Sequence, residues 1–445
     1  MEALRRDLVI LLVLFTLVAV IRVTAPSDLA TGDQPLQAAY VRDVTERGSW
    51  IVQHLEDGTP ATKPPLYNWL AALPILVFGT ANEFLLKLPS LIAGLLTLLL
   101  TWSISRQIAG ERAAFFTGVL LVCSTMFSKQ IYFARTDMLL TLFIVGQIWA
   151  AVRVRPVAYW TFAALALLTK GPIGIAIPLL ALVVFWWREG NLREQARAMY
   201  LVPGLLISLI PVGTWFAAAL SAGGEEVWQQ LVVRETIDRF AEGSKSKEHK
   251  HLLYYVPHFF VRMAPASFFA AVALVALRMR RQAFRPMLLA AWWFLVPFVM
   301  LSLVPSKRVD RLFPIFPAVC ILAGWVLDRW FSGDRQRGVS ATLHLVAAAL
   351  ILAGLTIAIG VPSGLVGAGT PDRPAVITAA TLLTGGGLAM LLAIRRRAAS
   401  TFIAALAFAM LVLIAVYQHV LSEPARQADL LPQRSLGEKV SRSGG

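Results

Sequence analysis

Long apolar segments recur along almost the whole chain and are separated by short polar connections. Several are shorter than the roughly twenty residues that a membrane span requires, and 157–169 is the weakest of them. The pattern predicts an all-α polytopic membrane protein with about thirteen transmembrane helices. The expected spans are residues 8–24, 84–105, 113–128, 138–152, 157–169, 172–187, 200–220, 257–277, 286–304, 311–328, 340–360, 375–394 and 400–420.

The composition agrees with a membrane protein. Hydrophobic residues make up 57% of the chain and charged residues only 15%, whereas soluble domains average about 25% charged residues. So few charges cannot cover a water-facing surface. The net charge of +15 would suggest nucleic acid in a soluble protein. Here the basic residues lie in short clusters between apolar runs, which indicates orientation in a membrane and no nucleic-acid partner.

Every second connection is short and rich in arginine, so the positive-inside rule places that side in the cytoplasm. These arginines are Arg5, Arg6, Arg106, Arg112, Arg153, Arg155, Arg188, Arg193, Arg197, Arg278, Arg280, Arg281, Arg285, Arg329, Arg335, Arg337, Arg395, Arg396 and Arg397. No small-residue cleavage site follows the first apolar run, so we expect a retained first helix and a cytoplasmic N-terminus. One transmembrane domain is expected over 1–420, and the tail 421–445 then lies outside.

The long connections, 25–83 and 221–256, fall on the outer side, where loops of mixed chemistry are expected to form the site. The first loop contains two expected interfacial helices. One lies between Asp33 and Gly48, with apolar residues at helical spacing. The other follows the turn Lys63-Pro64-Pro65 and carries aromatic anchors. Residues 225–240 suggest a third.

Two acidic residues lie near the same outer surface. Asp33 follows the first span and Asp137 begins the fourth. Together they could serve as a general base and an orienting group. The alternative for Asp33, at even weight, is a helix N-cap before Pro35, and Asp137 could cap its own helix. A carboxylate this close to hydrocarbon requires a partner, for which Arg135 is the candidate.

Three sets of outer cations could bind phosphate. Lys63 is held by a rigid turn and is a suitable phosphate ligand, with a snorkelling lysine as the alternative. Lys170 lies at a helix end and has the same alternative. The cluster of Lys307, Arg308 and Arg311 opposes the positive-inside trend. A lipid head group or a lipid-linked phosphate would explain it.

Other candidate chemistry is weaker. Residues 245–255 include His249, Tyr254 and Tyr255, and a solvated basic loop with an aromatic belt is the alternative to a binding role. Two histidines one residue apart do not make a metal site. No cofactor is expected, and divalent-metal assistance stays open. The chain has neither a Walker A loop nor a D-x-D motif. No span has an acidic residue at its middle, unlike most ion-coupled transporters.

Motifs spread over residues 30–320 resemble those of bacterial polyprenyl-phosphate-sugar glycosyltransferases of the GT-C class. The aminoarabinose lipid A transferases and the protein O-mannosyltransferases are the nearest kin by motif. The matching pieces are Gly32-Asp33 with Tyr40 and Arg42, Gly48-Ser49-Trp50, Lys63-Pro64-Pro65-Leu66-Tyr67-Asn68-Trp69-Leu70, Asn82-Glu83-Phe84, Lys87-Leu88-Pro89-Ser90, Ala134-Arg135-Thr136-Asp137, Thr169-Lys170-Gly171-Pro172, Arg234-Glu235, Arg239-Phe240, His249, Tyr254-Tyr255 and Pro305-Ser306-Lys307-Arg308 with Pro314 and Pro317.

The resemblance implies a GT-C fold and an inverting transfer of a sugar from a polyprenyl (undecaprenyl) phosphate. The implied acceptor is lipid A or another envelope glycolipid on the periplasmic side of a bacterial inner membrane. Asp33 would be the base or acceptor-orienting acid, with Asp137 in support. A phosphate leaving group makes cations more useful than a general acid. The implied phosphate ligands are Lys63, Lys170, Lys307 and Arg308, and the implied substrate contacts are Tyr40, Tyr67, Glu83, His249, Tyr254 and Tyr255.

Three departures from the family pattern leave the sugar and the acceptor open. Gln34 stands where the family usually has glutamate, Leu36-Gln37 replaces an Arg-Tyr pair, and Thr62 replaces a frequent acid. A protein O-mannosyltransferase is therefore an alternative. A lipid or polysaccharide flippase is an alternative of another class. It predicts polar residues along a path through the bilayer, and the spans contain few.

Overall fold

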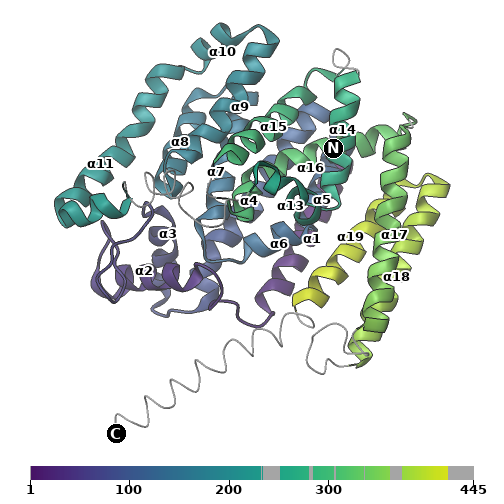
Figure 1. Ribbon diagram of the computed structural model, residues 1–445, viewed down its shortest axis with the longest axis horizontal. Helices are drawn as coiled ribbons and strands as arrows, with labels where there is room; N and C mark the ends of the chain where they lie inside the picture. The colour runs from purple at the N-terminus through teal and green to yellow at the C-terminus, as the bar shows by residue number, and fades with distance from the viewer. Residues whose placement is uncertain are drawn as a thin grey trace. The chain divides into compact units, whose positions relative to one another are not determined.

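The computed structural model describes residues 2–231, 233, 251–279, 284–304, 307–334, 336–360 and 373–418. Within these ranges the chain is helical, and strand-like pairing is confined to one isolated bridge between His54 and Pro60 (Figure 1). The all-α prediction is confirmed. The tail 421–445 and His249 lie outside the described residues, and the expected single domain over 1–420 stays a prediction.

Every predicted span coincides with a helix or with a pair of helices. The elements are α1 (Glu2–Val23), α2 (Gln34–Arg47), α3 (Leu66–Phe78), α4 (Glu83–Ala109), α5 (Glu111–Val122), α6 (Thr125–Ile131), α7 (Thr136–Val152), α8 (Pro156–Lys170), α9 (Ile173–Glu189), α10 (Leu192–Ala198), α11 (Leu201–Trp228), η3 (Leu252–Tyr254), α13 (Tyr255–Arg262), α14 (Ala266–Met279), α15 (Met287–Leu303), η5 (Val309–Ile315), α16 (Phe316–Phe331), α17 (Arg337–Gly360), α18 (Arg373–Arg396) and α19 (Ala399–Val416).

The count of thirteen spans is not confirmed. Among the described residues, six helices are long and apolar enough to cross a membrane, or eight if two bent pairs each count as one span. The pair α5–α6 bends by 67°, and the pair that ends in α14 bends by 115°. Other predicted spans, such as α7 and α15, are apolar but only 17 residues long. The chain is nevertheless a multi-pass membrane protein.

Local signals explain where the helices around the site begin and end. The Asn82 side chain accepts the Leu85 N–H at 2.9 Å and starts α4, and Ser124 starts α6 in the same way. Helix α2 carries a proline in its first turn and ends at Gly48, which adopts the left-handed conformation that glycine tolerates. The predicted interfacial helix between Asp33 and Gly48 is therefore confirmed as a helix.

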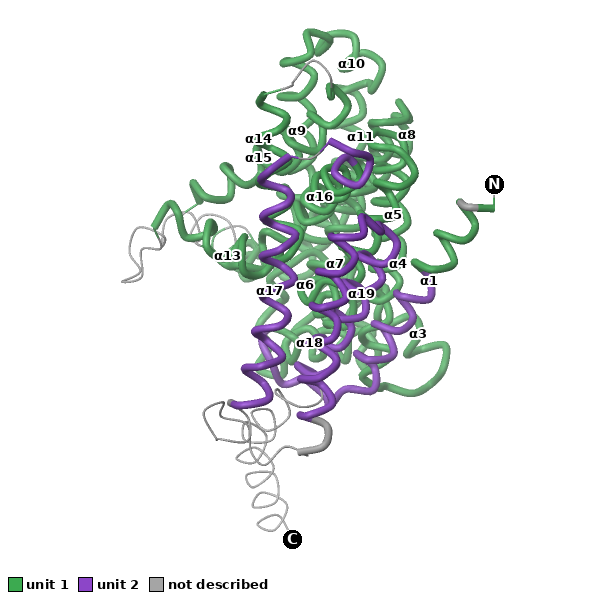
Figure 2. Tube along the Cα trace, turned by 90° about the vertical axis from the view of Figure 1, so that its right-hand side faces the viewer, with its two compact units in different colours: residues 1–11, 33–328 green, residues 12–32, 329–445 purple. Residues whose placement is uncertain are grey.

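The chain divides into two compact units, which Figure 2 distinguishes by colour. The first comprises residues 1–11 and 33–328 and contains the candidate site. Its central helix is α7, whose residues from Thr136 to Ile148 are all buried. Helices α4, α8 and α9 and the 3-10 helix η5 pack around α7, while α11 packs on α8 and α15 packs on α9. This packing gathers several helices around α7.

The second unit comprises residues 12–32 and 329–445. In it α17 packs on α18, and α18 packs on α19. Glycines allow α17 and α18 to approach closely, because a Cβ atom at Gly387 would lie 2.6 Å from Ile351 Cγ1. Small residues at helix contacts are typical of membrane proteins. Predicted spans 340–360, 375–394 and 400–420 are these three helices.

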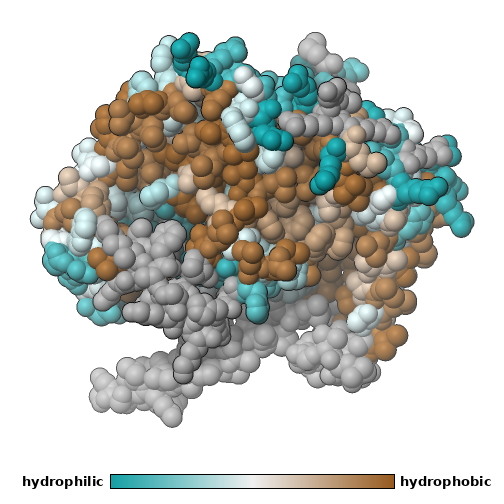
Figure 3. Space-filling model, turned by 45° about the horizontal axis from the view of Figure 1, so that its top comes forward, coloured by the Kyte–Doolittle hydropathy of each residue, from teal (hydrophilic) through white to brown (hydrophobic). Residues whose placement is uncertain are grey.

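Hydrophobic side chains cover much of the face shown in Figure 3, and hydrophilic residues gather toward its edges. Helix α11 illustrates the exposure, since only 11% of its most apolar window is buried. Leu206, Ile207 and Ile210 are each about 60% exposed. An exposed apolar face of this size belongs against lipid.

Candidate active site

The loop before α7 is held by two hydrogen bonds from distant helices. The Ser90 hydroxyl donates to the Phe133 carbonyl oxygen at 2.7 Å. The Ala134 N–H donates to Gln34 Oε1 at 2.8 Å, and the Gln34 side chain is fully buried. These contacts fix the peptide that precedes Arg135 against α2 and α4. They also give Gln34, one of the departures from the family pattern, a defined role as an acceptor.

Arg135 joins three carboxylates with its three nitrogens. Its Nη2 lies 2.9 Å from Asp33 Oδ2, and its Nη1 lies 2.8 Å from Asp310 Oδ2. Its Nε lies 3.5 Å from Asp137 Oδ2. The Arg135 side chain is only 9% exposed, so these pairs are poorly screened by water. The prediction that Asp33 and Asp137 converge agrees with this geometry, since both pair with one guanidinium.

The Asp33 side chain does not cap the helix that follows it. The residue precedes α2, but its side chain makes no capping hydrogen bond. Its carboxylate instead pairs with Arg135, and with Arg308 Nη2 at 3.1 Å. Partial burial alone would raise the pKa of Asp33, but the two guanidinium groups outweigh burial and hold that pKa below its usual range. Asp33 is therefore ionised at neutral pH.

Tyr255 holds the backbone from which Arg308 reaches Asp33. The Tyr255 hydroxyl contacts both the N–H and the carbonyl oxygen of Arg308 at 3.2 Å. The Tyr255 side chain is buried at the start of α13, where Tyr254 packs edge-on against it. Tyr255 was predicted as a substrate contact. Its observed contacts position Arg308.

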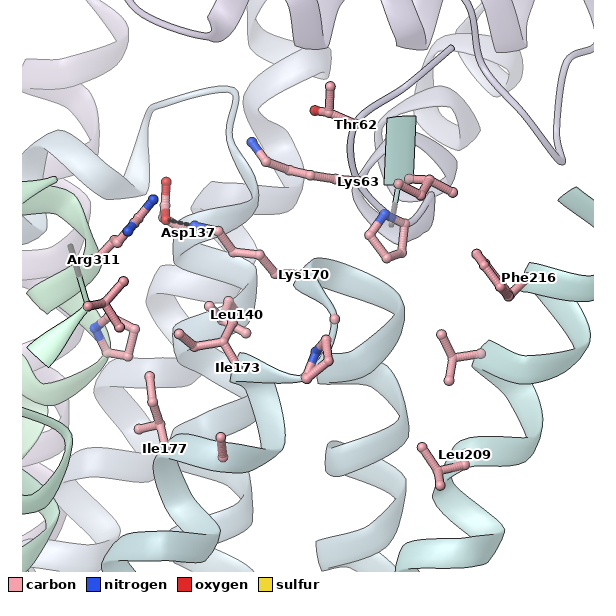
Figure 4. A pocket seen from close by; sticks show the side chains of 18 of the residues that line it. Thr62, Lys63, Asp137, Leu140, Lys170, Ile173, Ile177, Leu209, Phe216 and Arg311 are labelled. Atoms are coloured by element: carbon pink, nitrogen blue, oxygen red, sulfur yellow. Dashed lines mark hydrogen bonds and ion pairs between the residues drawn. The ribbon is translucent and has the colours of Figure 1, made fainter. Parts of the chain in front are cut away.

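A pocket of about 710 Å³ opens beside Asp137. In Figure 4 the side chains of Lys63, Lys170 and Arg311 converge on the Asp137 end of the pocket. Lys170 also pairs with Asp137. Gly171, with a φ of +73°, turns the chain from α8 into α9 and leaves Lys170 as the last residue of α8. The pocket therefore has a cationic mouth.

The rest of the pocket wall is apolar. It is formed by side chains of α7, α9, α11 and α15, with α11 facing α9 across the space (Figure 4). The apolar lining residues include Leu140, Ile173, Ile177, Leu209, Val212, Phe216, Met300 and Leu301. Cations at one end and hydrocarbon along the walls match a ligand with a charged head and an apolar tail.

The predicted basic cluster is split by the structure. Arg311 lines the pocket, whereas Arg308 and Lys307 do not. Arg308 turns to Asp33, and the Lys307 side chain is buried. Of the predicted phosphate ligands, Lys63 and Lys170 therefore reach the pocket mouth, and Arg311 completes the set. The roles of these residues stay predictions.

The other predicted substrate contacts lie away from the pocket lining. Tyr67 is fully buried, and its hydroxyl donates to the Leu86 carbonyl oxygen at 3.1 Å, so it packs α3 on α4. Tyr40 is buried on α2. Glu83 pairs with the fully buried Lys87. Tyr254 lies against Tyr255 and His258. These positions favour structural roles for Tyr67, Tyr40 and Glu83.

Asp310 was not predicted from the sequence as a site residue. Its only signal in the sequence is an acid placed among the cations of 307–311, and nothing in the pattern pairs it with Arg135. Among the described residues, no three His, Cys, Asp or Glu side chains form a group that could hold a metal ion. Arg135 occupies the space between the three carboxylates of the site.

The helical fold is shared with solved structures of ArnT and of an oligosaccharyltransferase, and together with the sequence matches it confirms the resemblance predicted from the motifs. The crystal structure of ArnT from Cupriavidus metallidurans bound to undecaprenyl phosphate matches with a TM-score of 0.72 and 24% identity, over 97% of this chain and 80% of that one. The apo oligosaccharyltransferase of Archaeoglobus fulgidus matches with a TM-score of 0.54 and 12% identity, over 93% of this chain and 56% of that one.

Sequence comparison points to the same group. Residues 62–216 match the family described as dolichyl-phosphate-mannose-protein mannosyltransferase. The undecaprenyl phosphate-alpha-4-amino-4-deoxy-L-arabinose arabinosyl transferase of Shewanella sediminis is 24% identical over 79% of this chain. A protein of the same description from Pseudomonas aeruginosa is 27% identical over 69% of this chain. The chain spans 65% and 58% of the lengths of these two relatives.

Proposed function

We propose that this protein is a membrane glycosyltransferase that moves a sugar from a polyprenyl phosphate to an envelope glycolipid such as lipid A. One observation carries the proposal: a pocket with three cations at its mouth and apolar walls from four helices. The site would face the periplasm from a bacterial inner membrane, with the N-terminus in the cytoplasm. Two supports are the fold shared with ArnT and the activity for which the similar arabinosyl transferases are named.

In this proposal Lys63, Lys170 and Arg311 bind the donor phosphate, and the prenyl chain lies along the apolar wall. Three cations suit a leaving group that gains negative charge as its bond to the sugar breaks. Lys170 is already paired with Asp137, so its charge is partly compensated.

The proposed transfer is a displacement at the anomeric carbon. An acceptor oxygen forms a new bond to that carbon, the bond from the carbon to the phosphate oxygen breaks, and polyprenyl phosphate leaves. Attack from the face opposite the phosphate inverts the configuration. Asp33 shares the Arg135 guanidinium with Asp137, and it would orient the acceptor by accepting a hydrogen bond from one of its hydroxyl groups. A carboxylate whose pKa is held down is a weak base.

The weak basicity of Asp33 favours an acceptor oxygen that is already ionised. A phosphate monoester needs no deprotonation, whereas a sugar or serine hydroxyl does. A phosphorylated glycolipid therefore fits the site better than a hydroxyl acceptor does. A protein O-mannosyltransferase is the second candidate, since the family matching residues 62–216 has that description.

Mass spectrometry of envelope lipids tests the proposal. Cells with and without the gene should differ by the mass of one sugar on one lipid, and the difference should return with the wild-type protein. The Asp33→Asn variant should not restore it, while purified Asp33→Asn should still bind undecaprenyl phosphate. A flippase would keep moving lipid with this substitution. Unchanged lipids together with a missing hexose on a secreted protein would favour the second candidate.

A further inference from the structure

Three buried amide side chains form a continuous hydrogen-bonded row beneath the candidate site. Gln37 Nε2 donates to Asn68 Oδ1, and Asn68 Nδ2 donates to Gln53 Oε1 at 3.0 Å. Gln53 Nε2 then donates to the carbonyl oxygens of Ser49 and Trp50, both at 2.9 Å. None of the three amide side chains is more than 8% exposed. Neither the proposed transfer nor the helix packing alone requires such a row.

The direction of the row is fixed at one end. The two backbone carbonyls can only accept, so the Gln53 amide must turn its NH₂ group toward them. Gln53 Oε1 then faces Asn68 Nδ2, and Asn68 Oδ1 is left to accept from Gln37. Every amide in the row depends on the orientation of the next. Loss of one donor therefore leaves buried polar atoms unpaired along the whole row.

The row connects the two groups that the proposed reaction needs. At one end, Gln37 lies one helical turn after Asp33, and its backbone N–H donates to the Asp33 carbonyl oxygen at 3.2 Å. At the other end, the Gln53 carbonyl oxygen accepts the Ala61 N–H at 2.7 Å. Ala61 stands two residues before Lys63. The middle residue, Asn68, belongs to α3, which Lys63 precedes.

The same segment is also tied to the pocket wall. The Trp215 indole N–H donates to the Ile51 carbonyl oxygen at 2.9 Å, and Trp215 lines the pocket. The Trp69 indole N–H donates to the Trp50 carbonyl oxygen at 2.6 Å. Three successive carbonyls, from Ser49 to Ile51, are therefore held by side chains of the loop, α3 and α11. The end of the amide row is thus anchored on the wall that faces the proposed prenyl chain.

We propose that Gln37, Asn68 and Gln53 act as positioning residues that set the placement of Asp33 relative to Lys63. This inference rests on the proposed function, because it concerns the acceptor side and the donor-phosphate side of one reaction. Reacting groups must be held within about 1 Å, and a misplacement of that size costs roughly 100-fold in rate. A continuous row of hydrogen-bonded amides can hold two helices and a loop in place with that accuracy.

The test uses the full chain in nanodiscs. Asn68→Leu removes both hydrogen bonds of the middle amide. Asn68→Asp keeps the shape but removes the donor to Gln53, so it serves if the first variant folds poorly. Gln107→Glu is the matched control, because Gln107 is an exposed amide that donates to the Val152 carbonyl oxygen. Spin labels at cysteines replacing Leu36 and Leu73, which are 44% and 50% exposed, report the α2–α3 distance.

Both Asn68 variants should broaden the α2–α3 distance distribution. They should also lower kcat about 10- to 100-fold with the donor KM changed less than about threefold, and Gln107→Glu should do neither. An unchanged distance distribution would overturn the proposal, as would a broadened one with wild-type kcat. If wild-type protein transfers no sugar from any polyprenyl phosphate, the proposed function fails. In that case the measured α2–α3 distances still test whether the amide row holds these two helices in place.

Discussion

The hydroxyl of Tyr255 accepts a hydrogen bond from the Arg308 N–H and donates one to the Arg308 carbonyl oxygen. One side chain of α13 thereby fixes the peptide that carries a guanidinium to Asp33. The contact also explains why Arg308 faces Asp33 while Arg311, three residues later, faces the pocket.

Tyr255→Phe should lower the proposed turnover about tenfold. The substitution keeps the ring packing and removes the hydroxyl, and an unmade buried hydrogen bond costs about 1–3 kcal/mol. Donor binding should change little, because neither Tyr255 nor Arg308 lines the pocket. Tyr200→Phe, at a residue that is 63% exposed, is the control. Equal turnover of the wild type and Tyr255→Phe would refute the positioning role.

Arg135→Lys should be nearly as harmful as Arg135→Ala. Lysine keeps the charge, but a single ammonium cannot reach three carboxylates in the directions that Nε, Nη1 and Nη2 do. Removing one partner of a buried ion pair costs about 3–5 kcal/mol. We expect turnover to fall at least 100-fold and thermal stability in detergent to drop. Arg112→Lys, in the ion pair with Asp328, is the matched control. A fully active Arg135→Lys would sink the idea.

The acidic limb of the pH–rate profile should shift in Arg308→Gln. Asp33 has a lowered pKa, so its ion pairs are complete above the ordinary carboxyl pKa and are lost as the pH falls through the lowered value. The wild type should therefore show no Asp33 titration between about pH 5 and 8. Removing one guanidinium lets burial raise the pKa of Asp33, so the acidic limb should move to higher pH. Profiles that superimpose would contradict this assignment.

Lys63→Ala and Arg311→Ala should each weaken binding of undecaprenyl phosphate about 10- to 100-fold. A charge-assisted hydrogen bond to phosphate contributes about 1.5–3 kcal/mol. Binding can be measured by quenching of Trp215, which lines the same pocket. Arg193→Ala, on α10 and outside the pocket lining, should bind like the wild type. If Arg308→Ala weakens binding as much as Arg311→Ala does, the phosphate lies elsewhere.

Gly387→Ala should destabilise the second unit, whereas Gly385→Ala should not. A Cβ atom at Gly387 would lie 2.6 Å from Ile351 Cγ1 and 2.8 Å from the Ala347 carbonyl oxygen, while Gly385 has nothing within 4 Å. Overpacking of this kind costs about 1–3 kcal/mol, and alanine otherwise favours a helix by about 1 kcal/mol over glycine. The melting temperature in detergent measures both. Equal melting temperatures would mean that α17 and α18 do not pack this closely.

Hydropathy alone predicted where the helices lie, because each apolar run must satisfy its backbone within one helix. It did not predict their length or their bends. The run 113–128 is uncharged and mostly apolar, yet Ser124 caps a new helix inside it. A hydroxyl among apolar residues was the available signal. Short helices such as α7 were predicted correctly as helices, although they are too short to count among the six to eight candidate spans of the described residues.

The residue types of the candidate site could be predicted from the sequence, but most of their contacts could not. Asp33, Lys63 and Asp137 could be chosen because charged residues near hydrocarbon are costly without a function. The pairing of Asp137 with Arg135 was also predicted and agrees with the structure. The pairing of Arg135 with Asp33 and Asp310 was not predicted, since Arg135 is separated by 102 residues from Asp33 and by 175 from Asp310. Adjacency in the sequence suggested that Lys307, Arg308 and Arg311 act together. In the structure, the 3-10 helix η5 and the hydrogen bond between Tyr255 and Arg308 orient these side chains differently.

Helix α11 gives the pocket an unusual boundary. On one side it presents Leu209 and Phe216 to the pocket, and on the other it exposes Leu206 and Ile210. A single helix thus separates the cavity from the surrounding hydrocarbon. A prenyl chain too long for about 710 Å³ needs no tunnel through the protein. In the proposed function its far end can remain dissolved among lipid tails while the head is engaged, so that exchange of a spent carrier for a loaded one would be a sideways step within the leaflet.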